Sequence, residues 1–296
     1  MHPTSVASEL EPASGWALLA GINNYEDPAT HAPLECPVRD AIGLYTLLTH
    51  PGFGNLDKEH VVLLLDGTDD EIEHTARVVV ARLERRYHFT ARPDIDSEIR
   101  GKRKRPSRSE ILAEINRIEH YADAAGLALV HISSHGYVWN GESYLIQPEA
   151  RHGLYEDTAV PLSWVRDRLA GSQARHRLLI ADLCFSGPDA ETPPLPWNEA
   201  SGSGVWRSLT RWLARRGEAT RAAGGIAALT ACERTEQCYE DDSHGVFTHY
   251  LLEALSGKAD RDKKGFVSLK DAFEFVRGRQ DLGHRAQHPA LADPSP

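Results

Sequence analysis

Short apolar runs alternate with stretches of helical periodicity along most of the chain, and this alternation limits the fold more than any other feature. The runs expected as strands lie at residues 16–25, 60–67, 127–136, 176–187 and 224–233, with a shorter one at 144–148. The spacing of apolar residues predicts helices at 38–50, 73–87, 107–124, 163–170, 247–257 and 268–279. Strands that alternate with helices are typical of an α/β fold with a central, mainly parallel sheet flanked by helices.

Two stretches interrupt the alternation. Residues 88–108 are basic and poor in apolar side chains, and residues 188–223 contain Pro, Glu, an SGSG run and several arginines. Long insertions without regular structure are usually functional or disordered in compact domains. We expect both stretches to be solvated loops.

Composition narrows the class of protein. The 296 residues are 41% hydrophobic and carry a net charge of -10, and no apolar run approaches the roughly 18 residues that a membrane span needs. The first residues lack the basic and apolar regions of a secretory signal, and four scattered cysteines are too few for a disulfide scaffold. We expect a soluble, cytoplasmic protein with reduced thiols, no membrane or nucleic-acid partner, and a basic substrate or partner.

Two of the expected strands end in polar clusters, ISSHG at 132–136 and ADLCFSG at 181–187. Sites in open parallel sheets collect beyond the carboxyl ends of the strands, so His135 and Cys184 would face each other if their strands are neighbours. An imidazole can stabilise a thiolate and protonate a leaving amine, which predicts nucleophilic catalysis by this pair. Gly136 lets its backbone N–H approach a substrate, and with the N–H of Cys184 it would form an oxyanion hole.

These motifs resemble those of the caspase-like cysteine peptidases, above all their metacaspase and bacterial branch. SSHG matches the family's catalytic-histidine motif and DLCFSG its D-x-C-x-S-G nucleophile motif, although Phe185 stands where metacaspases often have His. The resemblance spans roughly residues 14–279 and implies the caspase-hemoglobinase fold in a regulated bacterial protease. We expect an N-terminal tail at 1–13, one peptidase domain at 14–280 and a C-terminal tail at 281–296.

The resemblance also bears on specificity. Metacaspase-like enzymes line their primary pocket with acidic and hydroxyl groups, and the matching positions here are Asp40, Ser133 and Asp182. Strand alternation puts Ser133 on the face of His135, and Asp182 on the face of Cys184. Two carboxylates suit a guanidinium, whereas caspases that cut after Asp need a basic pocket. We expect protein or peptide substrates with Arg or Lys at the cut site.

The sequence contains no clear motif for metal binding. No His or Cys spacing suggests zinc, so no firm metal site and no required cofactor are expected. Calcium enters through the resemblance, because many metacaspases depend on it, and Glu149, Asp157 and Asp189 match such an acidic cluster only in part. The run at 260–265 begins like an EF-hand loop, but Lys264 and Asp271 stand where other ligands are needed.

The segment 188–223 directly follows the nucleophile strand, and its arginines are candidate cleavage points for this enzyme or for an upstream activating protease. They are Arg207, Arg211, Arg215, Arg216 and Arg221. An exposed loop of this kind is open to proteolysis, so we expect a zymogen that is activated by cleavage here or by an effector.

Two functions of other classes stay open. One is a non-catalytic caspase-like scaffold that binds partners, and the other is a Cys–His hydrolase that acts on small amides. A scaffold needs neither His135 nor Cys184, and an acidic pocket for a long basic side chain favours a peptide over a small amide.

Overall fold

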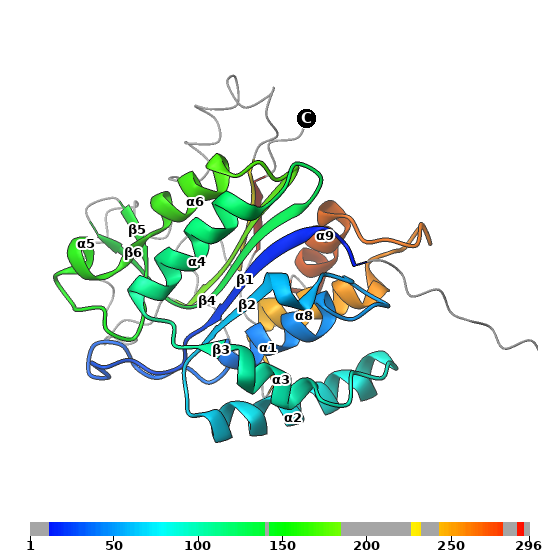
Figure 1. Ribbon diagram of the computed structural model, residues 1–296, viewed down its shortest axis with the longest axis horizontal. Helices are drawn as coiled ribbons and strands as arrows, with labels where there is room; N and C mark the ends of the chain where they lie inside the picture. Colours follow the sequence, from blue (N-terminus) through cyan, green and yellow to red (C-terminus); the bar gives the residue numbers. More distant parts are fainter. Residues whose placement is uncertain (1–11, 140–141, 185–225, 232–242, 281–288, 293–296) are drawn as a thin grey trace, which may run out of the picture.

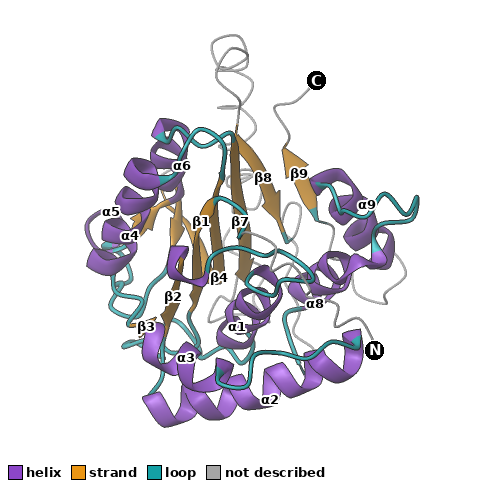
Figure 2. Cartoon of the chain, turned by 45° about the vertical axis from the view of Figure 1, so that its right-hand side comes forward, coloured by secondary structure: helices purple, strands orange, loops and turns teal. Residues whose placement is uncertain are grey.

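The computed structural model describes residues 12–139, 142–184, 226–231, 243–280 and 289–292 of the chain. In these residues one twisted sheet runs through the molecule, and helices pack on both of its faces (Figures 1 and 2). Within the described parts, no helix has the length and apolar character needed to cross a membrane.

The central sheet has the strand order β3-β2-β1-β4-β7-β8-β9, and its neighbours are parallel except for the pair β8 and β9. The strands are β1 (Gly15–Gly21), β2 (Val61–Leu65), β3 (Arg103–Lys104), β4 (Leu127–Trp139), β7 (His176–Cys184), β8 (Ile226–Thr230) and β9 (Ala290–Ala292). The predicted α/β fold with a mainly parallel sheet is therefore confirmed. Later strands of the chain are added on both sides of the neighbouring strands β1 and β4. The sheet therefore changes direction between these two strands, and such a switch point opens a crevice at their carboxyl ends.

β4 is longer than its parallel neighbours. Its last residues, 136–139, leave the parallel ladder and pair antiparallel with β5 (Glu142–Leu145), which in turn pairs with β6 (Val160–Pro161). Gly136 lies where the strand changes partner. A Cβ at this position would lie 3.0 Å from Cβ of Leu183 on β7, which is tighter than an ordinary contact, so glycine favours the close approach of the two strands.

Each face of the sheet buries its own apolar layer. The helices on one face are α1 (Pro37–Leu48), α2 (Asp69–Tyr87), α3 (Ile95–Lys102), α8 (Val246–Glu253) and α9 (Leu269–Gln280). The helices on the other face are α4 (Arg108–Tyr121), α5 (Tyr155–Thr158) and α6 (Leu162–Gly171). Neighbouring residues of β1 show the alternation, since Leu19 joins the first layer and Leu18 the second. A fully buried side chain of this kind contributes roughly 1.5–3 kcal/mol, which makes these layers the main source of stability.

Local sequence signals set the helix starts. Thr68 and Glu71 form a reciprocal capping box at the start of α2, and the Ser107 hydroxyl accepts from the backbone of Glu110 at the start of α4. A short 3-10 turn, η1 (Lys58–His60), precedes β2. A π-helical turn, η2 (Ala254–Lys258), continues α8 as far as Gly257, whose φ of 98° ends the regular helix.

The basic stretch at 88–108 is not the solvated loop that the sequence predicts. It contains α3 and the edge strand β3, because Ile95 and Ile99 lie four residues apart on one helix face and bury 96% or more of their surface. Its charges are compensated by carboxylates in neighbouring elements, as in the ion pair between Arg103 and Asp69 at 2.6 Å. Two apolar residues at helical spacing were enough to anchor a segment whose composition indicates a loop.

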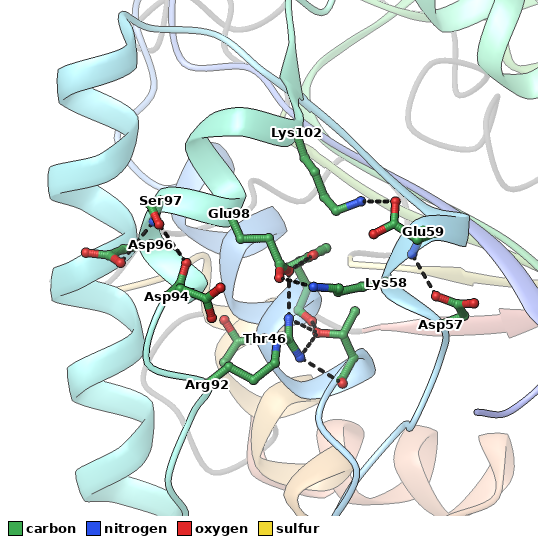
Figure 3. Close-up of polar contacts among 12 residues, drawn as sticks. Thr46, Asp57, Lys58, Glu59, Arg92, Asp94, Asp96, Ser97, Glu98 and Lys102 are labelled. Carbon is green, nitrogen blue, oxygen red and sulfur yellow. Dashed lines mark hydrogen bonds and ion pairs between the residues drawn. The ribbon is translucent and has the colours of Figure 1, made fainter. Parts of the chain in front are cut away.

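A buried carboxylate joins this segment to α1, and we call the group around it the Glu98 network (Figure 3). Glu98 accepts hydrogen bonds from Tyr45 of α1, from Lys58 at 2.9 Å and from Arg92 at 2.7 Å. Burial tends to raise the pKa of Glu98, but the bonds from these three donors outweigh it and leave the pKa below its ordinary value. Burial and the same carboxylate raise the pKa of Tyr45. The negative charge of Glu98 is compensated by Lys58 and Arg92, and the bond from Tyr45 holds α3 against α1.

The sheet also reaches into the segment 281–296, which the sequence assigns to a C-terminal tail. Ala290–Ala292 forms β9 and pairs antiparallel with β8. A run of three apolar residues, Ala-Leu-Ala, shows too little alternation to be recognised as a strand, and only pairing with a neighbouring strand makes it one.

Candidate functional site

The pairing of β4 with β7 brings the two predicted catalytic positions together. These strands are parallel partners from Leu127 and His176 up to His135 and Cys184, which form the last pair of the ladder. Neighbouring strands lie about 4.8 Å apart, so the backbones of His135 and Cys184 are adjacent at the carboxyl edge of the sheet. The strands are neighbours as predicted, and the pair is placed by its backbone register.

His135 is 1% exposed, and its ring nitrogen Nε2 lies 2.7 Å from the backbone oxygen of Ala32. A carbonyl oxygen can only accept, so Nε2 must carry the proton in this contact. In the neutral imidazole Nδ1 then holds the lone pair, and it is the ring nitrogen that can take a proton from a thiol. The tautomer needed for a general base is thus fixed by the loop that contains Ala32.

Tyr25, in the same loop, holds His135 from the other side. The backbone N–H of His135 donates to the Tyr25 hydroxyl at 2.9 Å, and the two rings stack with centroids 4.8 Å apart. The start of the loop is fixed by Asp66, whose carboxylate accepts the backbone N–H groups of Asn23 and Asn24, each at 2.7 Å. Burial raises the pKa of Asp66 in spite of these bonds. The chain from Asn23 to Ala32 therefore forms a rigid support for the histidine.

The three predicted pocket residues also converge, and we call them the acidic cluster: Asp40, Ser133 and Asp182. Ser133 and Asp182 are register partners on β4 and β7, and the Ser133 hydroxyl donates to Oδ2 of Asp40 at 3.1 Å. A Cβ on Gly245 would lie 3.1 Å from Oδ2 of Asp182 and 3.2 Å from Oδ2 of Asp40, so both carboxylates approach the same point. All three residues are at most 2% exposed. Two buried carboxylates thus lie close together at the carboxyl edge of the sheet.

Residues at the start of α8 complete this cluster, and the sequence analysis did not single them out. Oδ1 of Asp40 accepts the backbone N–H of Gly245 at 3.0 Å and lies 3.1 Å from Nδ1 of His244. The Thr248 hydroxyl donates to Oδ2 of Asp182 at 2.8 Å. The run GVFTHYLLEAL, one of the motifs that resemble the family, contains Gly245 and Thr248 and could have pointed to them, but it does not include His244.

The structure also places two of the three residues considered for calcium. Oε1 of Glu149 accepts the backbone N–H of Arg108 at 2.6 Å, and Asp157 is exposed on α5. Asp189 lies outside the described residues. Within the described ranges no three His, Cys, Asp or Glu side chains gather as a metal site would require.

Two further sets of candidate residues are the cleavage arginines and the EF-hand-like run at 260–265. All five candidate cleavage arginines lie in 185–225, outside the described residues. The EF-hand-like run is occupied by its own contacts, since Lys264 forms a 2.7 Å ion pair with Asp271.

Comparisons with known proteins agree with this architecture. The family model for the caspase domain of peptidase family C14 matches residues 14–294. Among solved structures, the chain is similar to the crystal structure of protein GSU0716 from Geobacter sulfurreducens, with a TM-score of 0.55 and 13% sequence identity, covering 94% of this chain and 92% of that chain. At this identity the similarity concerns the fold. No curated protein matches the sequence.

Proposed function

This chain belongs to the caspase domain family of peptidases, and from that premise we propose that it is a cysteine endopeptidase that cleaves after Arg or Lys with Cys184 as nucleophile. The observation that carries the proposal is the last pair of the β4–β7 ladder, His135 and Cys184. It sets the backbones of His135 and Cys184 side by side at the carboxyl edge of the sheet, next to the switch point between β1 and β4, where α/β folds build their sites.

The proposed reaction follows from the tautomer of His135. Nδ1 takes the thiol proton of Cys184, and the thiolate attacks the carbonyl carbon of the scissile peptide bond. The backbone N–H groups of Gly136 and Cys184 are the proposed donors to the oxyanion that forms. When the C–N bond breaks, the imidazolium returns the proton to the leaving amine. A water molecule, deprotonated by the same ring, then hydrolyses the thioester.

Convergence of the acidic cluster supports the proposed specificity. Asp40 and Asp182 approach one point from a helix and a strand, and a planar guanidinium can donate to two carboxylates at once. The substrates proposed are therefore proteins or peptides with Arg, and next Lys, before the cut bond.

A panel of fluorogenic peptides tests the function in one assay. Peptides that end in Arg, Lys or Asp before the reporter are incubated with the wild-type protein and with Cys184→Ala and His135→Ala. We expect cleavage of the Arg and Lys peptides, and a loss of at least about 1000-fold in either variant, because residues that act as one catalytic unit lose activity together. Cleavage by Cys184→Ala at the wild-type rate would refute the assignment, and preference for Asp would refute the pocket. A protein that cleaves none of the peptides would favour a scaffold.

We further propose that cleavage in 188–223 activates the enzyme. The test replaces Arg207, Arg211, Arg215, Arg216 and Arg221 together with Gln and compares activity before and after treatment with trypsin. The proposal predicts activation of the wild type only. Full activity in uncut protein contradicts it. No cofactor is proposed to be required, and parallel assays with EDTA and with added calcium test whether calcium acts through Glu149, Asp157 and Asp189.

A further inference from the structure

The loop that fixes His135 contains a second buried histidine directly before Ala32. His31 is 3% exposed, and its ring lies 6.1 Å from the ring of His135, centroid to centroid. Burial, together with the nearby His135, lowers the pKa of His31 to about 4. His31 is therefore neutral at pH 7. Since His31 and Ala32 are adjacent in the chain, the position of the His31 ring and the position of the Ala32 carbonyl depend on each other.

The His31 ring is held by a phenol from a different part of the fold. Nε2 of His31 lies 3.0 Å from the hydroxyl oxygen of Tyr155, the first residue of α5. Tyr155 is fully buried, and its hydroxyl also lies 2.9 Å from Nδ1 of His152. One phenolic oxygen thus bridges two imidazoles.

Counting protons gives this bridge a direction. Tyr155 has one O–H, so it must donate to one imidazole and accept an N–H from the other. Nδ1 of His31 is buried and has no hydrogen-bond partner among the residues that the structure describes. An unpaired buried acceptor is tolerated more often than an unpaired buried N–H, which places the proton of His31 on Nε2. Nε2–H of His31 then donates to Tyr155, and the Tyr155 O–H donates to His152.

The ring of Tyr155 and its hydroxyl have separable roles. The ring packs among aromatic side chains, with centroid distances of 4.4 Å to Tyr137 and 6.4 Å to Tyr144. The hydroxyl alone makes the bridge to His31 and His152. Removing only the oxygen therefore leaves the aromatic packing in place, including the edge contact with the His31 ring at a centroid distance of 5.9 Å, and removes the hydrogen bond that orients this histidine.

We propose that Tyr155 and His31 are positioning residues for His135, acting through the Ala32 carbonyl that fixes its tautomer. The inference rests on the proposed peptidase function, and neither residue touches the substrate. Reaction geometry is sensitive to displacements of about 1 Å, which can cost about 100-fold in rate. A released His31 lets the Ala32 carbonyl move, so His135 spends less time with Nδ1 directed for proton transfer.

The experiment compares two variants that each delete one phenolic oxygen from the same group of aromatic rings. Tyr155→Phe breaks the bridge, and Tyr144→Phe is the matched control. Values of kcat and KM are measured on an Arg-terminated peptide, and unfolding temperatures are measured alongside. We expect Tyr155→Phe to lower kcat about 10- to 100-fold with KM within twofold, and Tyr144→Phe to keep both constants within twofold. Equal kcat in both variants overturns the proposal, as does a loss that appears in KM.

A second pair of variants keeps the test decisive if Tyr155→Phe folds poorly. In His31→Gln the amide nitrogen can replace Nε2 as donor to Tyr155, whereas His31→Leu fills the space without a donor. The proposal predicts at least about fivefold higher kcat for the Gln variant. Similar values for the two variants contradict it.

The outcome is distinguishable from failure of the proposed function. If the wild-type protein cleaves no peptide, the peptidase proposal has failed. The positioning role is then tested by the rate at which iodoacetamide alkylates Cys184, followed by mass spectrometry of its peptide. Slower alkylation in Tyr155→Phe than in Tyr144→Phe supports the role, because a displaced His135 stabilises less thiolate. Equal rates overturn it.

Discussion

Helix α1 contributes to two buried carboxylate groups that are built in different ways. Asp40, in its first turn, belongs to the acidic cluster, whereas Tyr45, one turn further on, binds Glu98. The donors to Glu98 include the cations Lys58 and Arg92. The described donors to Asp40 and Asp182 are hydroxyls, a backbone amide and an imidazole.

The comparison sets a structural group beside a proposed functional one. Glu98 is compensated by ammonium and guanidinium groups of the chain itself, so its charge serves to join α3 to α1. The described donors to Asp40 and Asp182 orient these two carboxylates. Asp40 and Asp182 come from elements that meet at the carboxyl edge of the sheet, beside His135. This position distinguishes the cluster that we propose receives a basic side chain.

The largest expected effect comes from removing one charge of the acidic cluster. Asp182→Asn keeps an oxygen that can accept from Thr248, so we expect the fold to persist. The cost of breaking a buried charge pair is about 3–5 kcal/mol, which corresponds to a loss of about 150- to 5000-fold in kcat/KM for Arg peptides. Asp40→Asn should act in the same direction.

The Glu98→Gln variant is the control for this prediction, because it also removes one buried carboxylate charge. Its kcat/KM for Arg peptides should stay within about threefold of the wild type. A similar loss of Arg cleavage in both variants would mean that the two carboxylate groups do not differ in function.

The free energy of unfolding should fall more in Glu98→Gln than in Asp182→Asn, the reverse of their order in activity. Glu98→Gln leaves Lys58 and Arg92 without their charged partner, and we expect the free energy of unfolding to fall by about 3 kcal/mol. This lies at the low end for buried pairs, because the Lys58 side chain is 43% exposed and solvent screens part of the interaction. Urea unfolding at pH 7 measures it. A larger loss of stability in Asp182→Asn would reverse the roles assigned to the two groups.

Much of the fold could be predicted from the sequence because it depends on local patterns. The strand that contains His135 and the strand that ends at Cys184 are apolar runs closed by a polar motif, and both occur where the pattern places them. Asp40, Ser133 and Asp182 were found through the family resemblance, and strand alternation explains why Ser133 and Asp182 share one side of the sheet.

The remaining parts of the site depend on contacts that have no local signature. The Ala32 carbonyl is a backbone atom, and any residue at that position would supply it. Tyr155 lies 124 residues from His31, so their contact exists only after the antiparallel extension of β4 has folded. The same holds for His244, which is 204 residues from Asp40. For α3, the basic composition outweighed two correctly spaced isoleucines in the sequence interpretation.

His131 is a third buried ionisable group. Unlike Glu98 and Asp40, it contacts neither a cation nor a neutral hydrogen-bond donor among the described residues. It lies on β4, two residues before Ser133 on the same face, and is fully buried between its register partners Leu19 and Ile180. Within the described part of the chain neither ring nitrogen has a hydrogen-bond partner, and burial lowers the pKa of His131 to about 3. The folded protein therefore contains this imidazole in the neutral form only.

This environment predicts the smallest of the three effects, a loss of stability in mild acid. Between about pH 3 and 6.5 the unfolded chain binds a proton at His131 and the folded protein does not, so stability falls as the pH drops through 6.5. From pH 7 to pH 5 the loss amounts to about 2 kcal/mol. His131→Leu suits the apolar neighbours and removes the titrating group, so its loss over this range should be smaller by that amount. Urea unfolding at both pH values measures the difference, and the contribution of His31 cancels because both proteins contain it. Equal losses would mean that His131 accepts its proton in the folded state as readily as in the unfolded one.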